Sequence, residues 1–158
     1  FEDDIKACRN IRRYLESFLP NLPNFGTLHL YTPPKHHRTL GRTPAVFDES
    51  HYGWDMWGAQ GVVFSRDSLR EFLASSHNLG YRDTEIGRSN AHKDAAIGIW
   101  AKAVGRGVYY HVPSMLEHLP LVSLIGSGFH QAQEYVGDDF DATVWIGKGP
   151  TLIEERIL

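Results

Sequence analysis

Helix-like and strand-like segments alternate along this chain, and that alternation restricts its fold more than any other feature of the sequence. Apolar residues recur at helical spacing over 8–19, 69–73 and 97–104. Runs with the composition of β-strands lie between and beyond these stretches, at 26–31, 57–64, 108–112 and 142–146. This order predicts an α/β fold, in which a mixed sheet is flanked by helices.

Proline and glycine predict where two of the helices begin and end. Pro20 and Pro23 should end the first helix, because proline cannot continue an α-helix. The third helix should begin near Lys93 or Asp94 and end at Gly105, since glycine is the residue that most readily terminates a helix.

The second helix has the clearest start signal. Ser65 is a predicted N-cap, and Asp67 lies in the first turn, where the helix dipole favours a negative charge. The apolar face of this helix should consist of Leu69, Phe72 and Leu73.

Composition limits the classes of partner. With 158 residues, 42% of them hydrophobic, the chain is expected to form a single domain over 1–158. A net charge of −3 with scattered basic residues argues against a nucleic-acid partner. No apolar run approaches the ~18 residues of a membrane-spanning helix, so no membrane span is expected in this chain. Cys8, the single cysteine, cannot form an internal disulfide.

Three acidic residues stand near the start of the sequence, before the first predicted helix. Glu2, Asp3 and Asp4 would repel one another unless a cation lay nearby. Carboxylate oxygens are the ligands that Mg²⁺ and Mn²⁺ prefer, and such ions keep positions open for substrate phosphates. The alternative is that the acids only complement the dipole of the following helix.

Two neighbouring segments have features of a substrate-binding region. Residues 32–52 are rich in Pro, His, Arg and Thr without periodicity, which predicts a substrate-side loop. The following stretch is dense in aromatic and glycine residues. Aromatic faces pack on sugar rings and glycines allow close backbone approach, which makes candidates of Trp54, Trp57, Gly58, Ala59, Gln60 and Gly61. Alternatively, the tryptophans belong to the core and the glycines to a turn.

Asp94 is the candidate general base, because a carboxylate at a helix start is held rigidly enough to accept a proton from an attacking hydroxyl. Asp83 and Glu85 are rivals in sequence, and Asp94 could instead serve only as a cap. His118, which ends a turn after the strand at 108–112, is a candidate metal ligand or a structural histidine.

Taken in order, these segments resemble motifs of GT-A glycosyltransferases, particularly bacterial members and the N-glycan-branching N-acetylglucosaminyltransferases. The strand-terminal EDD version of the DxD motif is matched by Phe1-Glu2-Asp3-Asp4. The glycine-rich acceptor-side loop is matched by Trp57-Gly58-Ala59-Gln60-Gly61, and the helix-start acid by Asp94-Ala95-Ala96-Ile97-Gly98. The late PSL-x-x-H segment is matched by Pro113-Ser114-Met115-Leu116-Glu117-His118.

The resemblance implies a metal-dependent, inverting glycosyltransferase with a partial GT-A fold. Asp4, with Glu2, Asp3 and His118, would hold Mn²⁺ or Mg²⁺ on the diphosphate of a nucleotide-sugar donor. Asp94 would deprotonate a hydroxyl of a carbohydrate or glycoconjugate acceptor. A cytoplasmic bacterial location is implied, with the Golgi lumen as the alternative.

The family's nucleotide-binding half should precede the acidic motif, so we expect these 158 residues to represent the metal and acceptor side. Two other functional classes stay open. One is a non-catalytic carbohydrate-binding or scaffold domain. The other is a hydrolase that uses some of the nine histidines, although the sequence contains neither an H-x-x-x-H zinc pair nor a G-x-S-x-G elbow.

Overall fold

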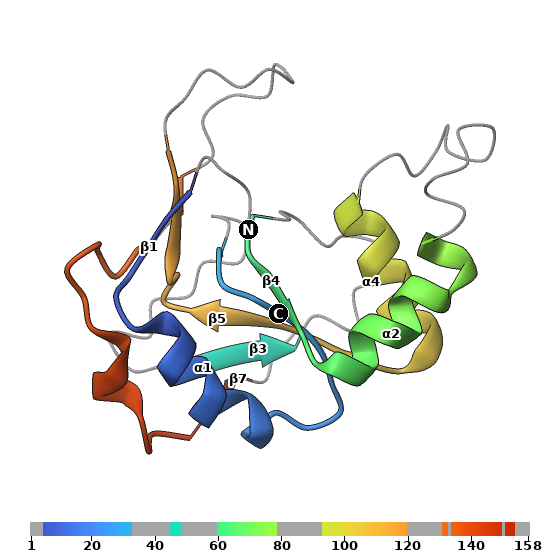
Figure 1. Cartoon of the computed structure of the whole chain (residues 1–158), viewed down its shortest axis with the longest axis horizontal. Helices are drawn as coiled ribbons and strands as arrows, with labels where there is room; N and C mark the ends of the chain where they lie inside the picture. The colour runs from blue at the N-terminus through green and yellow to red at the C-terminus, as the bar shows by residue number, and fades with distance from the viewer. Residues whose placement is uncertain are drawn as a thin grey trace, which may run out of the picture.

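A five-stranded mixed sheet lies at the centre of the fold, with helices packed against it (Figure 1). The structure is a computed structural model that describes residues 5–32, 45–48, 60–78, 93–119, 131–132, 134–149 and 151–153. Strands follow the order β4-β2-β5-β3-β7 across the sheet. The elements in chain order are β1 (Ile5–Ala7), α1 (Ile11–Phe18), η1 (Leu19–Asn21), β2 (Phe25–His29), β3 (Ala45–Asp48), β4 (Val62–Phe64), α2 (Arg66–Ala74), α4 (Lys93–Val104), β5 (Gly107–Val112), β6 (Leu116–His118), η3 (Ala142–Trp145) and β7 (Thr151–Ile153).

The strands of this sheet run in both directions. β2 is parallel to β5 and antiparallel to β4. On the other side of β5, β3 is antiparallel to it and β7 is parallel to β3. β1 and β6 form a separate antiparallel ribbon. The prediction of an α/β fold with a mixed sheet and flanking helices is therefore confirmed.

β5 is the central strand of the sheet, and its side chains are buried on both faces. Val108, Tyr110 and Val112 pack in the cluster that contains Trp100 of α4. Tyr109, which points the opposite way along the strand, packs in the cluster formed with α1. A strand covered on both sides has no alternation of apolar and polar residues, and 108–112 has none, since it contains Val, Tyr and one buried histidine.

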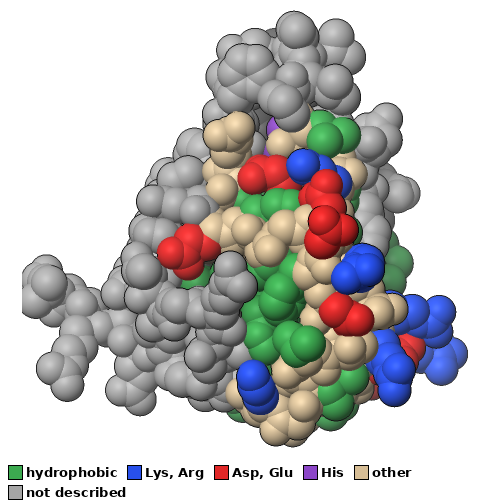
Figure 2. Space-filling view, turned by 90° about the vertical axis from the view of Figure 1, so that its left-hand side faces the viewer, with side chains coloured by type: hydrophobic (Ala, Val, Ile, Leu, Met, Phe, Trp, Pro, Cys, Tyr) green, Lys and Arg blue, Asp and Glu red, His purple; other side chains and the backbone are tan. Residues whose placement is uncertain are grey.

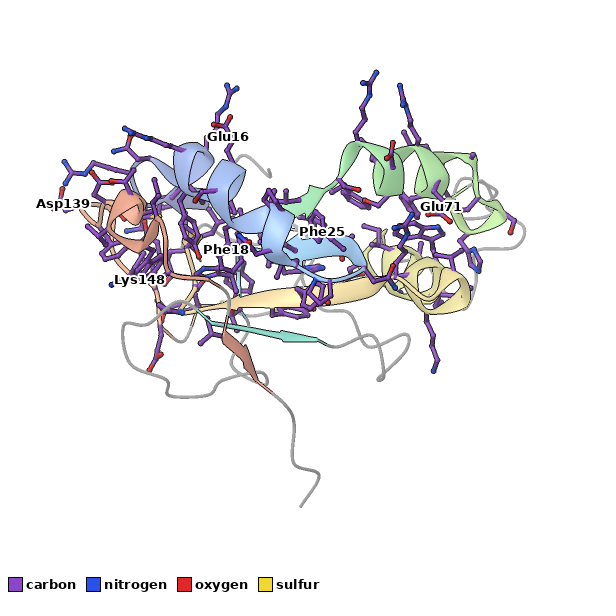
Figure 3. All side chains as sticks on the ribbon, turned by 90° about the horizontal axis from the view of Figure 1, so that it is seen from below. Glu16, Phe18, Phe25, Glu71, Asp139 and Lys148 are labelled. Atoms are coloured by element: carbon purple, nitrogen blue, oxygen red, sulfur yellow. The ribbon has the colours of Figure 1, made fainter. Side chains whose placement is uncertain are left out.

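α1 covers one face of the sheet with an amphipathic stripe. Tyr14 and Phe18 are one turn apart, with ring centroids separated by 5.0 Å, and the Trp145 ring of η3 lies 5.5 Å from Tyr14. In Figure 3, Phe18 points from the helix toward the sheet while Glu16 points away from it. Each such aromatic side chain contributes about 1.5–3 kcal/mol through burial, so the stripe fixes α1 on the sheet.

The second helix begins at the residue that the sequence predicts. Ser65 Oγ accepts a hydrogen bond of 3.0 Å from the Ser68 amide, which confirms the N-cap. The Ser68 hydroxyl is buried and donates to the carbonyl of Gly26 in β2 at 2.8 Å. The cap thus attaches α2 to the sheet as well as satisfying the helix end.

α4 packs beside α2 on the second apolar cluster. The ring centroids of Phe72 and Trp100 are 5.4 Å apart, and the Arg106 guanidinium lies 3.1 Å from the carboxylate of Glu71, which Figure 3 labels on α2. α4 begins at Lys93 and is followed by Gly105 at φ +67°, both as predicted. No helix within the described ranges is both long and apolar enough to cross a membrane.

The first helix is shorter than its apolar periodicity predicts. The chain forms β1 before it, and α1 starts only at Ile11, so Cys8 lies outside the helix. The Cys8 amide donates instead to the Met115 carbonyl at 3.2 Å, and Asn10 turns the chain with a φ of 57°. Pairing with a segment more than 100 residues away thus overrides the local helical pattern.

Three other predictions are corrected. The expected loop at 32–52 contains β3, the fourth strand of the sheet. The expected strand at 142–146 is the 3₁₀ helix η3, because the Asp141 carboxylate accepts from the Thr143 amide at 2.9 Å and caps a turn there. On α2, Leu69 and Leu73 are 40% and 48% exposed, and the core positions are taken by Ser68 and Phe72.

His111 lies within the aromatic core beneath α1, beside Tyr14 and Phe18. Its Nδ1 is 2.8 Å from the Pro113 carbonyl, which can only accept, so Nδ1 carries the proton. Nε2 then accepts from the Tyr14 hydroxyl at 2.9 Å. Burial lowers the pKa of His111 from 6.5 to about 4, while the hydrogen bond to Pro113 opposes this shift.

Mild acid should destabilise the protein through His111. Between pH 6.5 and 4 the unfolded state binds a proton that the folded state excludes, so stability should fall as pH falls, by about 3 kcal/mol over that interval. Urea denaturation of the wild type and His111→Gln at several pH values checks this. The difference in free energy of unfolding between the wild type and His111→Gln should shrink toward pH 4. His77→Gln should show the same pH dependence as the wild type. Parallel pH profiles for wild type and His111→Gln would contradict the assignment.

Gly107 has no room for a side chain. A Cβ placed there would lie 2.5 Å from the ring of Tyr109. That ring cannot easily move, because it is buried and its hydroxyl donates to the Pro23 carbonyl at 2.6 Å.

Gly107→Ala should therefore lower the free energy of unfolding by about 1–3 kcal/mol, as overpacking of a core does. Gly149→Ala is the control, because a Cβ at Gly149 would meet no atom within 4 Å. Both are measured by chemical denaturation. Equal stability of the two variants would show that the contact with Tyr109 is relieved at no cost.

Candidate functional site

The β1–β6 ribbon brings the start of the chain against the late histidine segment. Ile5 is paired with His118, and Ala7 with Leu116. Ile5 directly follows Asp4 in the sequence, so the residue attached to the acidic triplet is the cross-strand partner of the candidate histidine. Glu2, Asp3 and Asp4 themselves lie outside the described residues. A strand rather than a helix follows them, which corrects the predicted helix start.

A buried serine holds this ribbon to the end of β2. The Ser114 hydroxyl lies 2.6 Å from the Leu116 carbonyl and 3.1 Å from the Leu30 carbonyl, and it accepts from the Thr32 amide at 3.3 Å. The Leu30 carbonyl also accepts from the Met115 amide at 2.8 Å. These bonds join the carboxyl end of β2 to the turn that leads into β6.

His118 and Glu117 occupy opposite faces of the ribbon, because successive strand residues alternate. His118 is half-buried and shares its face with Ile5. The Glu117 carboxylate accepts from two backbone amides through Oε1, from His118 at 2.9 Å and from Ala132 at 2.8 Å. Glu117 therefore fixes the backbone around the candidate histidine.

Asp94 lies in the first turn of α4 and is half-buried. Its Oδ1 accepts from the amide of the next residue, Ala95, at 2.9 Å, which orients the carboxylate. In Figure 1 the β1–β6 ribbon lies at the left of the molecule and α4 at the right.

Two residues of the predicted acceptor-side loop lie within the described ranges. Gly61 is buried, and its carbonyl accepts from the Leu30 amide at 2.9 Å, next to the β2–β4 ladder. Gln60 precedes it and is half-buried. Trp54, Trp57, Gly58 and Ala59 lie outside the described residues.

The face that carries the ribbon and 134–149 has mixed charge. Figure 2 shows acidic and basic side chains interspersed over its described part. Lys6 lies 3.5 Å from the Asp138 carboxylate, and Arg9 donates to the Asp139 carbonyl at 2.6 Å. Hydrogen bonds from Thr143, with one from Asn10, lower the pKa of Asp141. The described part of this face therefore has no single-sign surface for a polyanion.

The described residues do not contain a complete metal site. Among them, no group of three or more His, Cys, Asp or Glu side chains is placed to share an ion. Of the four predicted metal ligands, His118 is the one that the structure describes.

The sequence did not point to the buried position of Tyr31. It lies just beyond the end of β2 and is buried near Glu117, whose charge adds to the effect of burial on its pKa. No local motif marks it, because its position depends on the pairing of distant segments.

No protein-family model, curated protein sequence or solved structure matches the chain. The functional interpretation therefore depends on the residues and geometry of this molecule.

Ser114→Ala should lower the free energy of unfolding by about 1–3 kcal/mol, since it leaves the Thr32 amide without its described acceptor. It should also shift the NMR resonances of Ile5 and His118. Ser17→Ala, which removes a half-buried hydroxyl bonded to the Tyr14 carbonyl at 2.8 Å, is the control and should shift neither. Unchanged stability of Ser114→Ala would mean that other contacts hold the ribbon in place.

Proposed function

We propose that this chain forms the metal and acceptor side of a metal-dependent GT-A glycosyltransferase. The observation that carries the proposal is the pairing of Ile5 with His118 in the β1–β6 ribbon. It joins the segment attached to the acidic triplet to the late histidine, two motifs that are more than 110 residues apart in sequence.

The donor set suits a hard divalent cation. Glu2, Asp3 and Asp4 supply carboxylates, and His118 supplies an imidazole, a combination that binds Mn²⁺ or Mg²⁺. When bound, such an ion neutralises charge on the diphosphate leaving group. Glu117 is not one of the proposed metal ligands, because its Oε1 accepts hydrogen bonds from the amides of His118 and Ala132.

Asp94 is the proposed general base. Its carboxylate accepts the proton of an acceptor hydroxyl as that oxygen bonds to the anomeric carbon of the donor sugar. The bond from the anomeric carbon to the diphosphate oxygen breaks in the same step, and a nucleoside diphosphate leaves. Attack from the opposite side inverts the anomeric configuration. The first turn of α4 orients the carboxylate through the Ala95 amide, which favours proton transfer.

The second candidate function is carbohydrate binding without turnover. It is favoured by the position of Asp94 in the first turn of α4, where an acid can serve only to complement the helix dipole. The two functions differ in whether a nucleotide is bound with metal and whether Asp94 affects turnover.

Binding of UDP to the full-length protein should require Mn²⁺ and should be lost in Asp4→Ala. His118→Ala should weaken it about tenfold or more, as loss of one metal ligand or its support does. Isothermal titration calorimetry with UDP, and then GDP, measures this with and without Mn²⁺. His77→Ala is the control and should bind as the wild type does. Absence of nucleotide binding under every condition would favour the carbohydrate-binding function.

Asp94→Asn should lower kcat about 10²- to 10⁴-fold while leaving UDP and Mn²⁺ affinity unchanged, because a neutral amide cannot accept the proton. Release of UDP from UDP-sugars in the presence of a panel of saccharide acceptors reports the rate. Asp67→Asn, which changes the first-turn acid of α2, is the matched control. Full activity of Asp94→Asn would remove Asp94 from the mechanism.

A further inference from the structure

One carboxylate oxygen at the end of β6 accepts two backbone amides from segments that are far apart in the sequence. Glu117 Oε1 accepts from the His118 amide at 2.9 Å and from the Ala132 amide at 2.8 Å, and both bonds are partly buried. Hydrogen bonds to a carboxylate are stronger than those between neutral groups. Glu117 thus joins the end of β6 to a chain segment 15 residues further on.

The His118 amide points away from β1. One rung beyond the β1–β6 pairs, the Cys8 amide donates to the Met115 carbonyl at 3.2 Å, which makes these two residues a hydrogen-bonded pair. Hydrogen-bonded and non-hydrogen-bonded pairs alternate along an antiparallel ladder. Ile5 and His118, three rungs further along, are therefore a non-hydrogen-bonded pair. The bond from the His118 amide to Glu117 accordingly lies on the outer edge of the ribbon.

This pattern makes the end of β6 depend on Glu117. His118 is the last residue of the strand, and its outward-pointing amide lies outside the ladder bonds. Glu117 takes that amide, and the bond from Ala132 holds the same carboxylate from the other side. The His118 peptide is thereby fixed, and with it the direction in which the imidazole leaves the strand.

The imidazole leaves the strand on the face that carries Ile5. Side chains of a non-hydrogen-bonded pair are close cross-strand neighbours. Glu117 points to the opposite face, where its partner Lys6 has its amine 3.5 Å from the Asp138 carboxylate. Glu117 therefore acts on His118 through the backbone and not as a second ligand beside it.

We propose that Glu117 is the positioning residue of His118 and holds its imidazole beside Ile5, the residue that follows Asp4. That the imidazole meets a divalent cation there rests on the proposed glycosyltransferase function. The positioning itself rests on the two amide bonds and on the register of β1 with β6. The alternative is that Glu117 only satisfies the strand edge, in which case its loss would leave the metal site unaffected.

Three substitutions separate the reach of the side chain from its charge. Glu117→Gln keeps an oxygen at the same reach and can accept the same two bonds. Glu117→Asp keeps the charge but is one methylene shorter, and Glu117→Ala has neither property. Glu16→Ala, which removes an exposed carboxylate of α1, is the control for the change in net charge. If Glu117→Ala does not fold, the comparison of Glu117→Gln with Glu117→Asp carries the test.

NMR of the full-length protein gives the first measurement. Amide hydrogen exchange at His118 and Ala132 should be about ten- to a hundredfold faster in Glu117→Ala and Glu117→Asp, since a hydrogen bond to a carboxylate is lost. The NOE between the His118 ring and the Ile5 methyl groups should weaken in the same two variants. Glu117→Gln and Glu16→Ala should resemble the wild type in both measurements. Wild-type exchange and NOE in Glu117→Ala and Glu117→Asp would overturn the proposal.

UDP affinity at saturating Mn²⁺, measured by calorimetry, gives the second measurement. It should fall about tenfold in Glu117→Ala and Glu117→Asp, as it does when the support of a metal ligand is lost, and it should be restored in Glu117→Gln. In a His118→Ala background, Glu117→Ala should have no further effect, because Glu117 acts through His118. Independent, multiplying effects of the two substitutions would overturn the positioning role.

The two measurements separate this proposal from the proposed function. Wild-type UDP affinity in both Glu117→Ala and Glu117→Asp would overturn the positioning role and leave the transferase function standing. If the wild type binds no UDP with Mn²⁺ while the exchange and the NOE change as expected, the positioning of His118 stands and the transferase function fails.

Discussion

The Leu30 carbonyl, at the carboxyl end of β2, is the hydrogen-bond acceptor on which the arrangement of the candidate site depends. It takes the Met115 amide at 2.8 Å, and the Ser114 hydroxyl lies 3.1 Å away. The turn that follows β5 is thereby held against β2, and β6 leaves that turn in a fixed direction. Because β1 pairs only with β6 among the described strands, the position of the N-terminal strand follows from the same contact.

The helix boundaries that depend only on neighbouring residues could be predicted from the sequence. The Ser65 cap, the start of α4 near Lys93 and the stop at Gly105 need only the residues next to them. The start of α1 was missed because the Cys8 amide pairs with Met115. η3 was mistaken for a strand because its residues are β-branched and apolar, while the decisive signal was the capping carboxylate of Asp141. The roles of His118 and Asp94 stay predictions from motifs, whereas the burial of Tyr31 near Glu117 could not be predicted, because it depends on the pairing of distant segments.

Buried polar groups in this molecule divide into two kinds. Some have described partners: His111 has Tyr14 and Pro113, and Ser68 has Gly26. Others, such as the Trp100 indole nitrogen and the Thr27 hydroxyl, have none among the described residues. Where a partner is present, as for His111 and Ser68, its hydrogen bond replaces the one to water that burial removes. Burying such a group therefore costs little free energy. The Tyr31 and Gln60 oxygens, like the Trp100 indole nitrogen, carry a desolvation cost with no compensating hydrogen bond among the described residues.

β5 sets the spatial relation between the two proposed catalytic regions. α4 ends just before this strand and carries Asp94 at its far end, while the Pro113 turn and β6 follow it and end at His118. Both faces of β5 are packed, Val108 and Tyr110 against one cluster and Tyr109 against the other, so the strand cannot shift without losing contacts on both sides. A packed interior resists such displacement strongly. Asp94 and His118 are thus both attached to this packed strand, Asp94 through α4 and His118 through the turn at Pro113 and β6.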